Sequence, residues 1–462
     1  MAAELPLLHS EADPRVANAR PAAEEGRRSV YVETYGCQMN VADSELVASI
    51  LSDAGFSITE RPDRADIILL NTCAVRQHAE ERVIGRASHL HGLRARNPNL
   101  TIGILGCMAQ HLAKSLPQRA PFVDLVMGPD SYRRLPEILG ATANEALLDV
   151  RLDRSENYVG LEPLRRKGTN AWVTIIRGCD KFCNFCIVPF VRGRERSIAA
   201  SEVVRQVEAI AAAGYREVTL LGQTVNSYRD GDCDFADLLR QVGAVDGIER
   251  LRFTSPYPKD FTDRTIEAMA ELPQVCPSLH LPVQSGSNTQ LEGMRRGYDI
   301  EEYRDLVHRL RKAIPDLALT TDIIVGFCGE TDDDFQRTID LMHEMRYDSA
   351  FMFKYSERDG TYAARNIEDD VAEEVKGERL QRIIALQETI SLEVNQKMAG
   401  RTVPVLVEGP SKRQNDQGSN NYGRSPHGKV TIFPQHAAPN SIVEVQVERT
   451  TSHTLFGDAV GA

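Results

Sequence analysis

The sequence predicts an α/β protein of several domains: a parallel α/β domain, a partial barrel of six βα units and a small antiparallel β-barrel. Strands and helices alternate over residues 29–145 and again over 165–397, a pattern typical of parallel sheets covered by helices. Residues 399–462 instead contain short alternating strands separated by Gly, Pro and Asn turns. A chain of 462 residues has room for about two to four domains.

The first region begins with a β-branched and aromatic run, SVYVETYG (29–36), that predicts a strand. DSELVASILSDAG (43–55) predicts a helix that ends at a glycine. Buried strands are expected at 65–72 and 101–106, with a helix over about 77–96 between them.

One cysteine follows each of these three strands, namely Cys37, Cys73 and Cys107. The carboxyl ends of parallel strands share one edge of a sheet, and ligands of open α/β sheets bind at that edge. The pattern C-x35-C-x33-C therefore favours a shared metal cluster despite its long spacing. Three core thiols at coincidental positions remain the alternative.

The central region predicts six strands with helices between them, as in an open (βα) barrel. In such barrels the chemistry lies at the carboxyl ends of the strands. The strands are expected at 172–176, 216–222, 249–255, 278–283, 319–327 and 349–356.

Cys179, Cys183 and Cys186 lie directly after the first of these strands, in the run RGCDKFCNFC. The spacing C-x3-C-x2-C offers one thiolate fewer than the four that usually hold a four-iron cluster. An iron without a protein ligand can bind a small molecule, so this spacing indicates a reaction centre. It also differs from the paired C-x2-C pattern of zinc sites. The other three cysteines, Cys233, Cys276 and Cys328, are expected to be ordinary small thiols.

Composition and charge limit the kinds of surface, membrane association and location that we expect for this protein. The net charge of −12 argues against a generally basic surface, although a local RNA-binding surface remains compatible with it. No run of about 18 apolar residues and no signal-peptide core occur, so we expect a cytoplasmic protein without a membrane span. Residues 1–28 are expected to be a disordered leader.

In the C-terminal region, VPVLVEG, GKVTIF and SIVEVQVERT predict the strands of the small β-barrel. Between them, residues 414–429 are expected to form a long polar loop that either faces solvent or meets phosphates.

Several motifs in order resemble the radical S-adenosylmethionine (SAM) methylthiotransferase family. They are YGCQMNVADSE, NTCAVR, GCMAQ, RGCDKFCNFCIVPFVRGRERS, LLGQTVNSY, SPYP, LPVQSGSNTQLEGMRRGY and TDIIVGFCGET. The resemblance covers about residues 29–460, and the tail is similar to the RNA-binding TRAM domain. Cys328 is a departure, because many members of the family have proline there.

The resemblance implies a Rossmann-like domain over 29–145, a radical SAM core over 165–397 and a TRAM domain over 399–462. It implies that Cys179, Cys183 and Cys186 hold a [4Fe–4S] cluster whose open iron binds SAM and generates a 5′-deoxyadenosyl radical. It also implies that Cys37, Cys73 and Cys107 hold a second [4Fe–4S] cluster, which carries the sulfur to be transferred.

Candidates for SAM contacts lie in the same motifs. They are Gln223, Asn226, Ser285, Gly286 and Gly326. Their alternative role is that of turn residues at strand ends. Arg192, Arg194 and Arg196 are expected either to meet tRNA phosphates or the SAM carboxylate, or to form a solvated basic turn.

Within the family, the motif YGCQMN and the sequence around Cys179 most resemble those of the tRNA-modifying branch. The implied reaction adds a methylthio group to C2 of N6-isopentenyladenosine next to the anticodon, with two SAM and a flavodoxin- or ferredoxin-type electron donor. A monomer is expected. The alternatives are the same chemistry on threonylcarbamoyl-adenosine in tRNA or on a ribosomal-protein aspartate, and a non-catalytic iron–sulfur RNA-binding protein.

Overall fold

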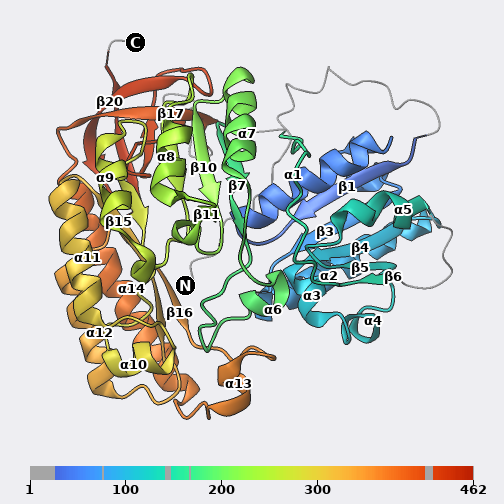
Figure 1. Ribbon diagram of the computed structural model, residues 1–462, viewed down its shortest axis with the longest axis horizontal. Helices are drawn as coiled ribbons and strands as arrows, with labels where there is room; N and C mark the ends of the chain where they lie inside the picture. The colour runs from blue at the N-terminus through green and yellow to red at the C-terminus, as the bar shows by residue number, and fades with distance from the viewer. Residues whose placement is uncertain (1–26, 75–76, 141–146, 166–167, 412–419, 461–462) are drawn as a thin grey trace. The chain divides into compact units, whose positions relative to one another are not determined.

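The structure is a computed structural model that describes residues 27–74, 77–140, 147–165, 168–411 and 420–460 (Figure 1). The chain forms two compact units. Unit 1 comprises residues 1–166, 177–179 and 187–196, and unit 2 comprises the remainder. Most of the expected leader, residues 1–26, lies outside the described residues. In the described part of the chain, no helix combines the length and apolar character that crossing a membrane requires.

Unit 1 contains a six-stranded sheet in the order β2-β1-β3-β4-β5-β6, and every neighbouring pair is parallel. This confirms the α/β class expected for the N-terminal region. The strands are β1 (Ser29–Thr34), β2 (Ser57–Thr59), β3 (Ile67–Thr72), β4 (Thr101–Gly106), β5 (Leu125–Met127) and β6 (Leu147–Asp149).

Alternate residues of the central strand β3 face opposite layers of helices. Ile68 and Leu70 pack with α2 and α3, whereas Ile67 and Leu69 pack with α1 and α5. A strand buried on both faces has the continuous apolar run seen in the sequence. The helices of unit 1 are α1 (Gln38–Asp53), η2 (Pro62–Arg64), α2 (Gln77–His91), η3 (Gly92–Ala95), α3 (Cys107–Leu112), α4 (Leu116–Arg119), η4 (Tyr132–Arg134), α5 (Leu135–Gly140) and α6 (Val188–Arg192).

Unit 2 contains the six strands expected for the open barrel. They form two parallel three-stranded sheets, β7-β10-β13 and β14-β15-β16. The sheets are linked where Leu251 of β13 pairs with Val275, just before β14. The strands are β7 (Asn170–Thr174), β10 (Glu217–Leu221), β13 (Arg250–Phe253), β14 (Ser278–His280), β15 (Ala318–Val325) and β16 (Ser349–Lys354), with short pieces β11 (Arg229–Asp230) and β12 (Cys233–Asp234). The two-residue strands β8 (Ile176–Arg177) and β9 (Arg196–Ser197) each contain one residue of either unit.

The helices of unit 2 carry capping signals that fix where several of them begin. Asp234, Asp299 and Thr331 each form a capping box with the acidic residue three positions later. The helices are α7 (Ala200–Ala212), η5 (Val225–Ser227), α8 (Phe235–Gly243), η6 (Pro258–Asp260), α9 (Asp263–Glu271), α10 (Asn288–Gly293), α11 (Ile300–Ala313), α12 (Asp332–Met345), α13 (Tyr362–Asn366) and α14 (Glu373–Gln396).

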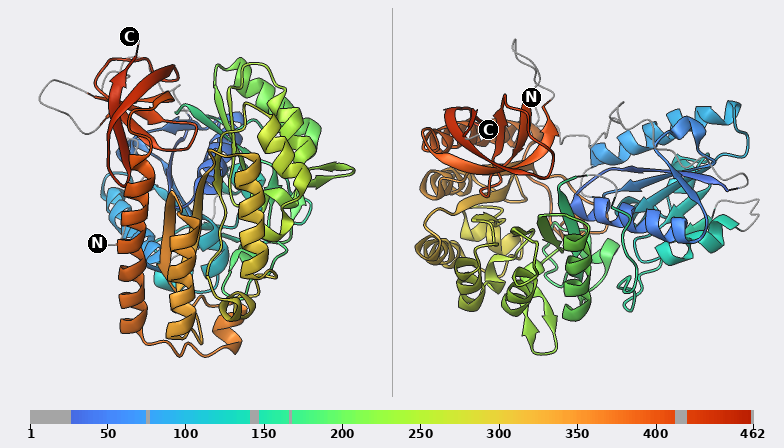
Figure 2. Two further views of the ribbon diagram at one scale, coloured as in Figure 1. Left: turned by 90° about the vertical axis from the view of Figure 1, so that its left-hand side faces the viewer. Right: turned by 90° about the horizontal axis from the view of Figure 1, so that it is seen from above.

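The long helix α14 leads into a closed five-stranded barrel at the C-terminal end of unit 2 (Figure 2, left). The strand order is β17-β18-β19-β21-β20, and only the described pair β19–β21 is parallel. The strands are β17 (Thr402–Pro410), β18 (Asn421–Arg424), β19 (Val430–Phe433), β20 (Ile442–Thr450) and β21 (Thr454–Ala459).

The expectation of one continuous polar loop over 414–429 was wrong in part. Residues 414–419 lie outside the described residues, but Asn421–Arg424 form strand β18. Gly423 lets β18 approach β17 closely, because a Cβ there would lie 2.0 Å from the Leu406 carbonyl oxygen. A short polar strand with a central glycine has little β signal in the sequence.

Two arginines of β13 tie the C-terminal barrel to the core of unit 2. Arg250 donates hydrogen bonds to the carbonyl oxygens of Pro404 and Arg424, each at 2.7 Å. Arg252 donates to the carbonyl oxygens of Ser425 and Pro426, each at 2.9 Å. The barrel is therefore packed as part of unit 2.

Candidate functional site

The structure places three cysteines at the carboxyl ends of three adjacent strands of unit 1. Cys37 follows β1, Cys73 follows β3 and Cys107 follows β4. Cys37 is the N-cap of α1, and Cys107 is the first residue of α3. The predicted shared edge of the sheet is confirmed, and a helix N-terminus is an environment that favours a thiolate.

The thiols of this set interact with one another. The Cys73 thiol lowers the pKa of Cys37 to about 6 by hydrogen bonding, and the charge of Arg192 acts in the same direction against the effect of burial. Burial raises the pKa of the Cys107 thiol, and Arg192 opposes that rise. Close thiols resist ionising together, so a metal cluster that binds all three would release protons.

A glycine precedes three of the six candidate cysteines, in the pairs Gly36–Cys37, Gly106–Cys107 and Gly178–Cys179. All three glycines have positive φ, which side chains other than glycine rarely adopt. At Gly106, a Cβ would also lie 2.4 Å from Asn71 Oδ1 and 2.7 Å from the Thr72 carbonyl oxygen. The strand end that carries Cys73 is thus packed directly against Gly106.

We predict that Gly106→Ala removes iron from the N-terminal cysteine set. Gly55→Ala is a matched control, because Gly55 has the same φ of +89° but no atom within 4 Å of the added Cβ. Both variants should lose about 1–2 kcal/mol of stability from backbone strain. After anaerobic reconstitution, the control should bind about eight irons and Gly106→Ala about four. Equal iron contents would show that the close contact at Gly106 does not shape the site.

A buried charge network lies beside Cys107. Asp43 is fully buried and accepts a hydrogen bond from Arg177 Nη2 at 3.0 Å, while Arg192 Nη1 lies 2.8 Å from its other oxygen. Arg192 Nε donates to Cys107 Sγ at 3.1 Å. The Nη2 group of Arg192 is buried and has no hydrogen-bond partner among the described residues.

The structure corrects the interpretation of two arginines in the RGRERS run. Arg192 and Arg196 are 4% and 8% exposed, and Arg196 pairs with Asp130 at 2.9 Å. They are buried ion-pairing residues and not part of a solvated turn or a phosphate-binding surface. Of the three arginines, Arg194 is the exposed one.

The second cysteine set lies within eight consecutive residues. Cys179 belongs to unit 1, where its N–H donates to the Gly193 carbonyl oxygen at 3.1 Å. Cys183 and Cys186 belong to unit 2, and the Cys186 N–H donates to the Cys183 carbonyl oxygen at 3.0 Å. Phe182, directly before Cys183, has a φ of +49°. Such backbone strain in a non-glycine residue persists where the surrounding structure enforces it.

Arg296, which sequence reasoning missed, contacts Cys183 of this set. Its side chain is buried, and its Nη1 donates to Cys183 Sγ at 3.4 Å. It lies in the motif LEGMRRGY, where the only local signal was a pair of adjacent basic residues. Its contact with a cysteine 113 positions earlier has no signature in the sequence.

The five candidates for SAM contacts differ in whether their atoms are already engaged in contacts within the protein. Asn226 is engaged at both ends by the backbone of Tyr257, with distances of 2.7 and 2.9 Å. Ser285 and Gly286 are buried against α12, where both contact Thr338. These contacts leave the two residues with a clear structural role.

Gly326 is closely packed by a neighbouring side chain, whereas Gln223 has a side-chain oxygen that makes no hydrogen bond among the described residues. A Cβ at Gly326 would lie 2.3 Å from Lys376 Cγ, so the Lys376 side chain fills that side of the glycine. Gln223 Oε1 is buried and has no hydrogen-bond partner among the described residues. Gln223 is therefore the candidate with an unused polar atom, and the role of all five in binding SAM stays a prediction.

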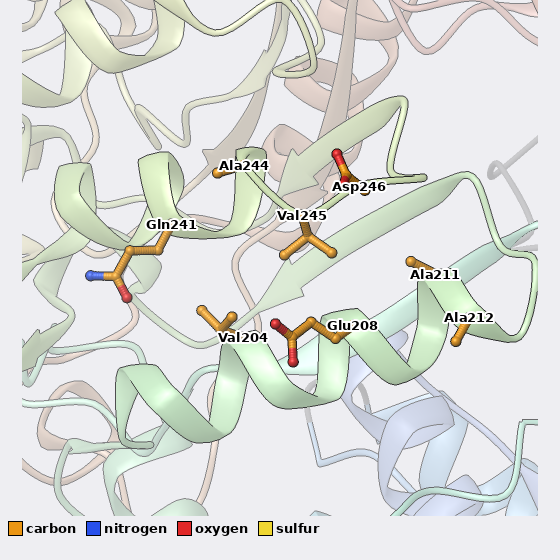
Figure 3. A pocket seen from close by; sticks show the side chains of 8 residues that line it. All are labelled: Val204, Glu208, Ala211, Ala212, Gln241, Ala244, Val245 and Asp246. Carbon is orange, nitrogen blue, oxygen red and sulfur yellow. The ribbon is translucent and has the colours of Figure 1, made fainter.

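A hollow on the helical layer of unit 2 does not coincide with these residues. Side chains of α7, α8 and the loop after α8 line it, among them Val204, Glu208 and Gln241 (Figure 3). It contains none of the predicted site residues and lies away from the carboxyl ends of the strands.

The donor sets fit polynuclear clusters better than single metal ions. Within the described ranges, no three His, Cys, Asp or Glu side chains are arranged to hold a metal ion. Neighbouring strands lie ~4.8 Å apart, so the backbone ends that carry the three cysteines are spread over roughly 10 Å. Thiolates are the ligands of iron–sulfur clusters. The buried guanidinium groups beside Cys107 and Cys183 would stabilise the negative charge of a cluster bound to these thiolates.

Comparison with known families and proteins covers nearly the whole chain. The pattern described as "Uncharacterized protein family UPF0004" matches residues 29–128, that of the Radical SAM superfamily matches 173–342, and that of the TRAM domain matches 396–460. The chain is 47% identical to a tRNA-2-methylthio-N(6)-dimethylallyladenosine synthase of Porphyromonas gingivalis strain W83, covering 96% of this chain and 97% of the relative. It is 44% identical to the synthase of the same name from Chloroherpeton thalassium, covering 96% and 99%.

Solved structures support the fold. The radical SAM methyltransferase TsrM from Kitasatospora setae, with cobalamin and a [4Fe-4S] cluster bound, aligns with a TM-score of 0.55 at 14% identity, covering 84% of this chain and 78% of that chain. The same enzyme with tryptophan and a SAM analogue bound gives 0.53. These matches confirm the multidomain α/β architecture. Because these relatives are 44–47% identical to the chain over 96% of its length, the chain belongs to the family of tRNA-2-methylthio-N(6)-dimethylallyladenosine synthases.

Proposed function

We propose that this protein is a radical SAM methylthiotransferase that adds a methylthio group to C2 of N6-isopentenyladenosine next to the anticodon in tRNA. The observation that carries the proposal is the 44–47% sequence identity, over 96% of the chain, to synthases named for this product. A radical SAM pattern and a TRAM pattern in one chain agree with radical chemistry on an RNA substrate.

The residues proposed to hold the cofactors are the two cysteine sets. Cys179, Cys183 and Cys186 would hold one [4Fe–4S] cluster, and Cys37, Cys73 and Cys107 the other. When bound, the first supplies reductive cleavage of SAM and the second supplies the sulfur to be transferred. The chain itself places the second set on three adjacent strand ends. It packs Cys107 and Cys183 in apolar clusters and holds a buried arginine against each of these two sulfurs.

The polar atoms for SAM are proposed at the strand ends of unit 2. Gln223 Oε1 is available to accept a hydrogen bond from SAM. Asn226, Ser285, Gly286 and Gly326 are proposed to line the same site mainly through their backbone, since neighbouring side chains or backbone already engage them.

The functional domains proposed are 29–145, 165–397 and 399–462. A tRNA bearing N6-isopentenyladenosine would be the substrate, and a flavodoxin- or ferredoxin-type protein would supply electrons. We also propose that the protein works as a monomer in the cytoplasm. The tRNA-modifying relatives and the match to the TRAM domain support the tRNA partner.

Nucleoside analysis tests the proposal. A strain that lacks the gene should accumulate N6-isopentenyladenosine and lose its 2-methylthio derivative, as measured by mass spectrometry of digested tRNA. Unchanged 2-methylthio-isopentenyladenosine would contradict the proposal. Loss of the methylthio group from threonylcarbamoyl-adenosine or from a ribosomal-protein aspartate would assign the alternative substrates. RNA binding without formation of 5′-deoxyadenosine would assign a non-catalytic protein.

The C-terminal barrel offers a residue for contact with tRNA. Arg449 is exposed on β20, and its guanidinium lies 3.9 Å from the centroid of the Phe456 ring. An arginine held by an aromatic ring can contact phosphates or stack on bases. We predict that Arg449→Glu weakens tRNA binding and lowers the slope of log affinity against log salt by about one. Gln446→Ala, on the exposed side of the same strand, should leave both unchanged. Equal salt slopes for the two variants would remove Arg449 from the interface.

A further inference from the structure

Arg296 is a buried cation with no carboxylate partner in the part of the chain that the structure describes. Its side chain is 6% exposed, and its nitrogen atoms donate to Tyr298 Oη at 3.1 Å, the Pro282 carbonyl oxygen at 2.9 Å and Cys183 Sγ at 3.4 Å. Its guanidinium also lies 4.8 Å from the centroid of the Tyr257 ring. Burying a charge without a counter-ion is costly. Among these partners, the Cys183 sulfur is the one suited to carry a compensating negative charge.

Unit 1 also contains a buried arginine charge that no carboxylate of its own balances. Arg177 and Arg192 share a single buried carboxylate, that of Asp43. The neighbouring Arg196 already has its own partner, Asp130. One positive charge therefore remains unbalanced in this network. Arg192 directs its Nε at Cys107 Sγ and keeps a buried Nη2 without a partner among the described residues.

We propose that Arg296 and Arg192 are the positioning residues that balance the charge of the two clusters and thereby set their reduction potentials. An oxidised four-iron core held by three thiolates carries one net negative charge. Each cysteine set has one buried positive charge in excess, in hydrogen-bond contact with a ligand sulfur. The inference rests on the proposed function, since it assumes that both sets hold clusters.

The direction of the effect follows from electrostatics. A cluster gains one negative charge when it is reduced, so a nearby guanidinium stabilises the reduced form more than the oxidised form. In a buried site this interaction is weakly screened. Hydrogen bonds to ligand sulfurs act in the same direction. Removing either arginine should therefore make the potential of its own cluster more negative.

The test uses two full-length backgrounds that each retain one cysteine set: C37A/C73A/C107A and C179A/C183A/C186A. In the first, Arg296→Met should shift the oxidised-to-reduced ratio of the cluster at least tenfold at fixed potential, or about 59 mV for one electron. Arg192→Met should leave it unchanged there. In the second background the two substitutions should exchange roles. Redox titration followed by electron paramagnetic resonance measures each potential.

The outcomes separate this inference from the proposed function. Absence of iron in both backgrounds would contradict the proposed function. Bound iron with potentials that neither arginine moves would overturn the inference and leave the proposed function standing. Arg296→Lys, which keeps the charge without the planar donor group, should restore part of the shift. If Lys shifts the potential as far as Met does, the charge-balancing role is overturned.

Unfolding of the iron-free protein provides the second readout. Arg296→Met removes an unbalanced buried charge, so it should not lower the unfolding midpoint of the iron-free chain. A marked fall would mean that Arg296 serves to hold the fold and would overturn its assignment to the cluster.

Discussion

A variant with Cys37, Cys73 and Cys107 all changed to Ala should still cleave SAM and should make no methylthiolated tRNA. The expected loss of thiolation is complete, because these residues would hold the sulfur-carrying cluster. The other cysteine set, where the radical is proposed to form, is left untouched. Anaerobic reactions with SAM and dithionite, followed by quantification of 5′-deoxyadenosine and of modified nucleosides, measure the two activities separately.

Three further cysteines provide a matched control. Cys233, Cys276 and Cys328 lie outside both sets, and Cys276 and Cys328 are buried. Changing these three to Ala removes the same number of thiols and should preserve both activities. Thiolation that persists in the variant of Cys37, Cys73 and Cys107 would refute the role of that set as sulfur donor.

Asp43→Asn should cost about 3–5 kcal/mol of stability, the loss expected when a buried ion pair is broken on one side. Asp43 is 0% exposed and is the carboxylate between Arg177 and Arg192, so its neutralisation leaves two buried guanidinium groups unbalanced. Because Arg192 also contacts Cys107, we expect weaker retention of iron by the N-terminal set. Urea unfolding of the iron-free protein measures the stability.

An exposed carboxylate in the same unit serves as the control for Asp43. Asp63 also pairs with an arginine, Arg61, but both side chains are solvent-accessible. Exposed pairs contribute little, so Asp63→Asn should leave the unfolding curve unchanged. If Asp43→Asn and Asp63→Asn behaved alike, the buried network would not be a significant source of stability.

The placement of the N-terminal cysteines could be predicted because strand ends are encoded locally. The short apolar runs before Cys73 and Cys107 are typical of buried strands, and parallel strands bring their carboxyl ends to one edge. The expected helix over 43–55 instead begins at Gln38, directly after Cys37. The sequence lacks a polar side chain there that would signal an ordinary cap, because the N-cap is the cysteine itself.

The arginines could not be placed from the sequence, since their partners are distant along the chain. Arg177 and Asp43 are separated by 134 positions, and Arg296 and Cys183 by 113. A local run such as RGRERS has the composition of a solvated turn, and only the fold reveals that two of its arginines are buried. The same limit applies to Ser285 and Gly286, whose contacts come from α12.

Each cysteine set is proposed to hold its own four-iron cluster. Iron and sulfide analysis of three anaerobically reconstituted proteins tests it most directly. We expect about eight irons per chain in the unmodified protein and about four in each variant that lacks one cysteine set. A variant that lacks Cys37, Cys73 and Cys107 but still binds about eight irons, or an unmodified protein that binds only about four, would contradict it.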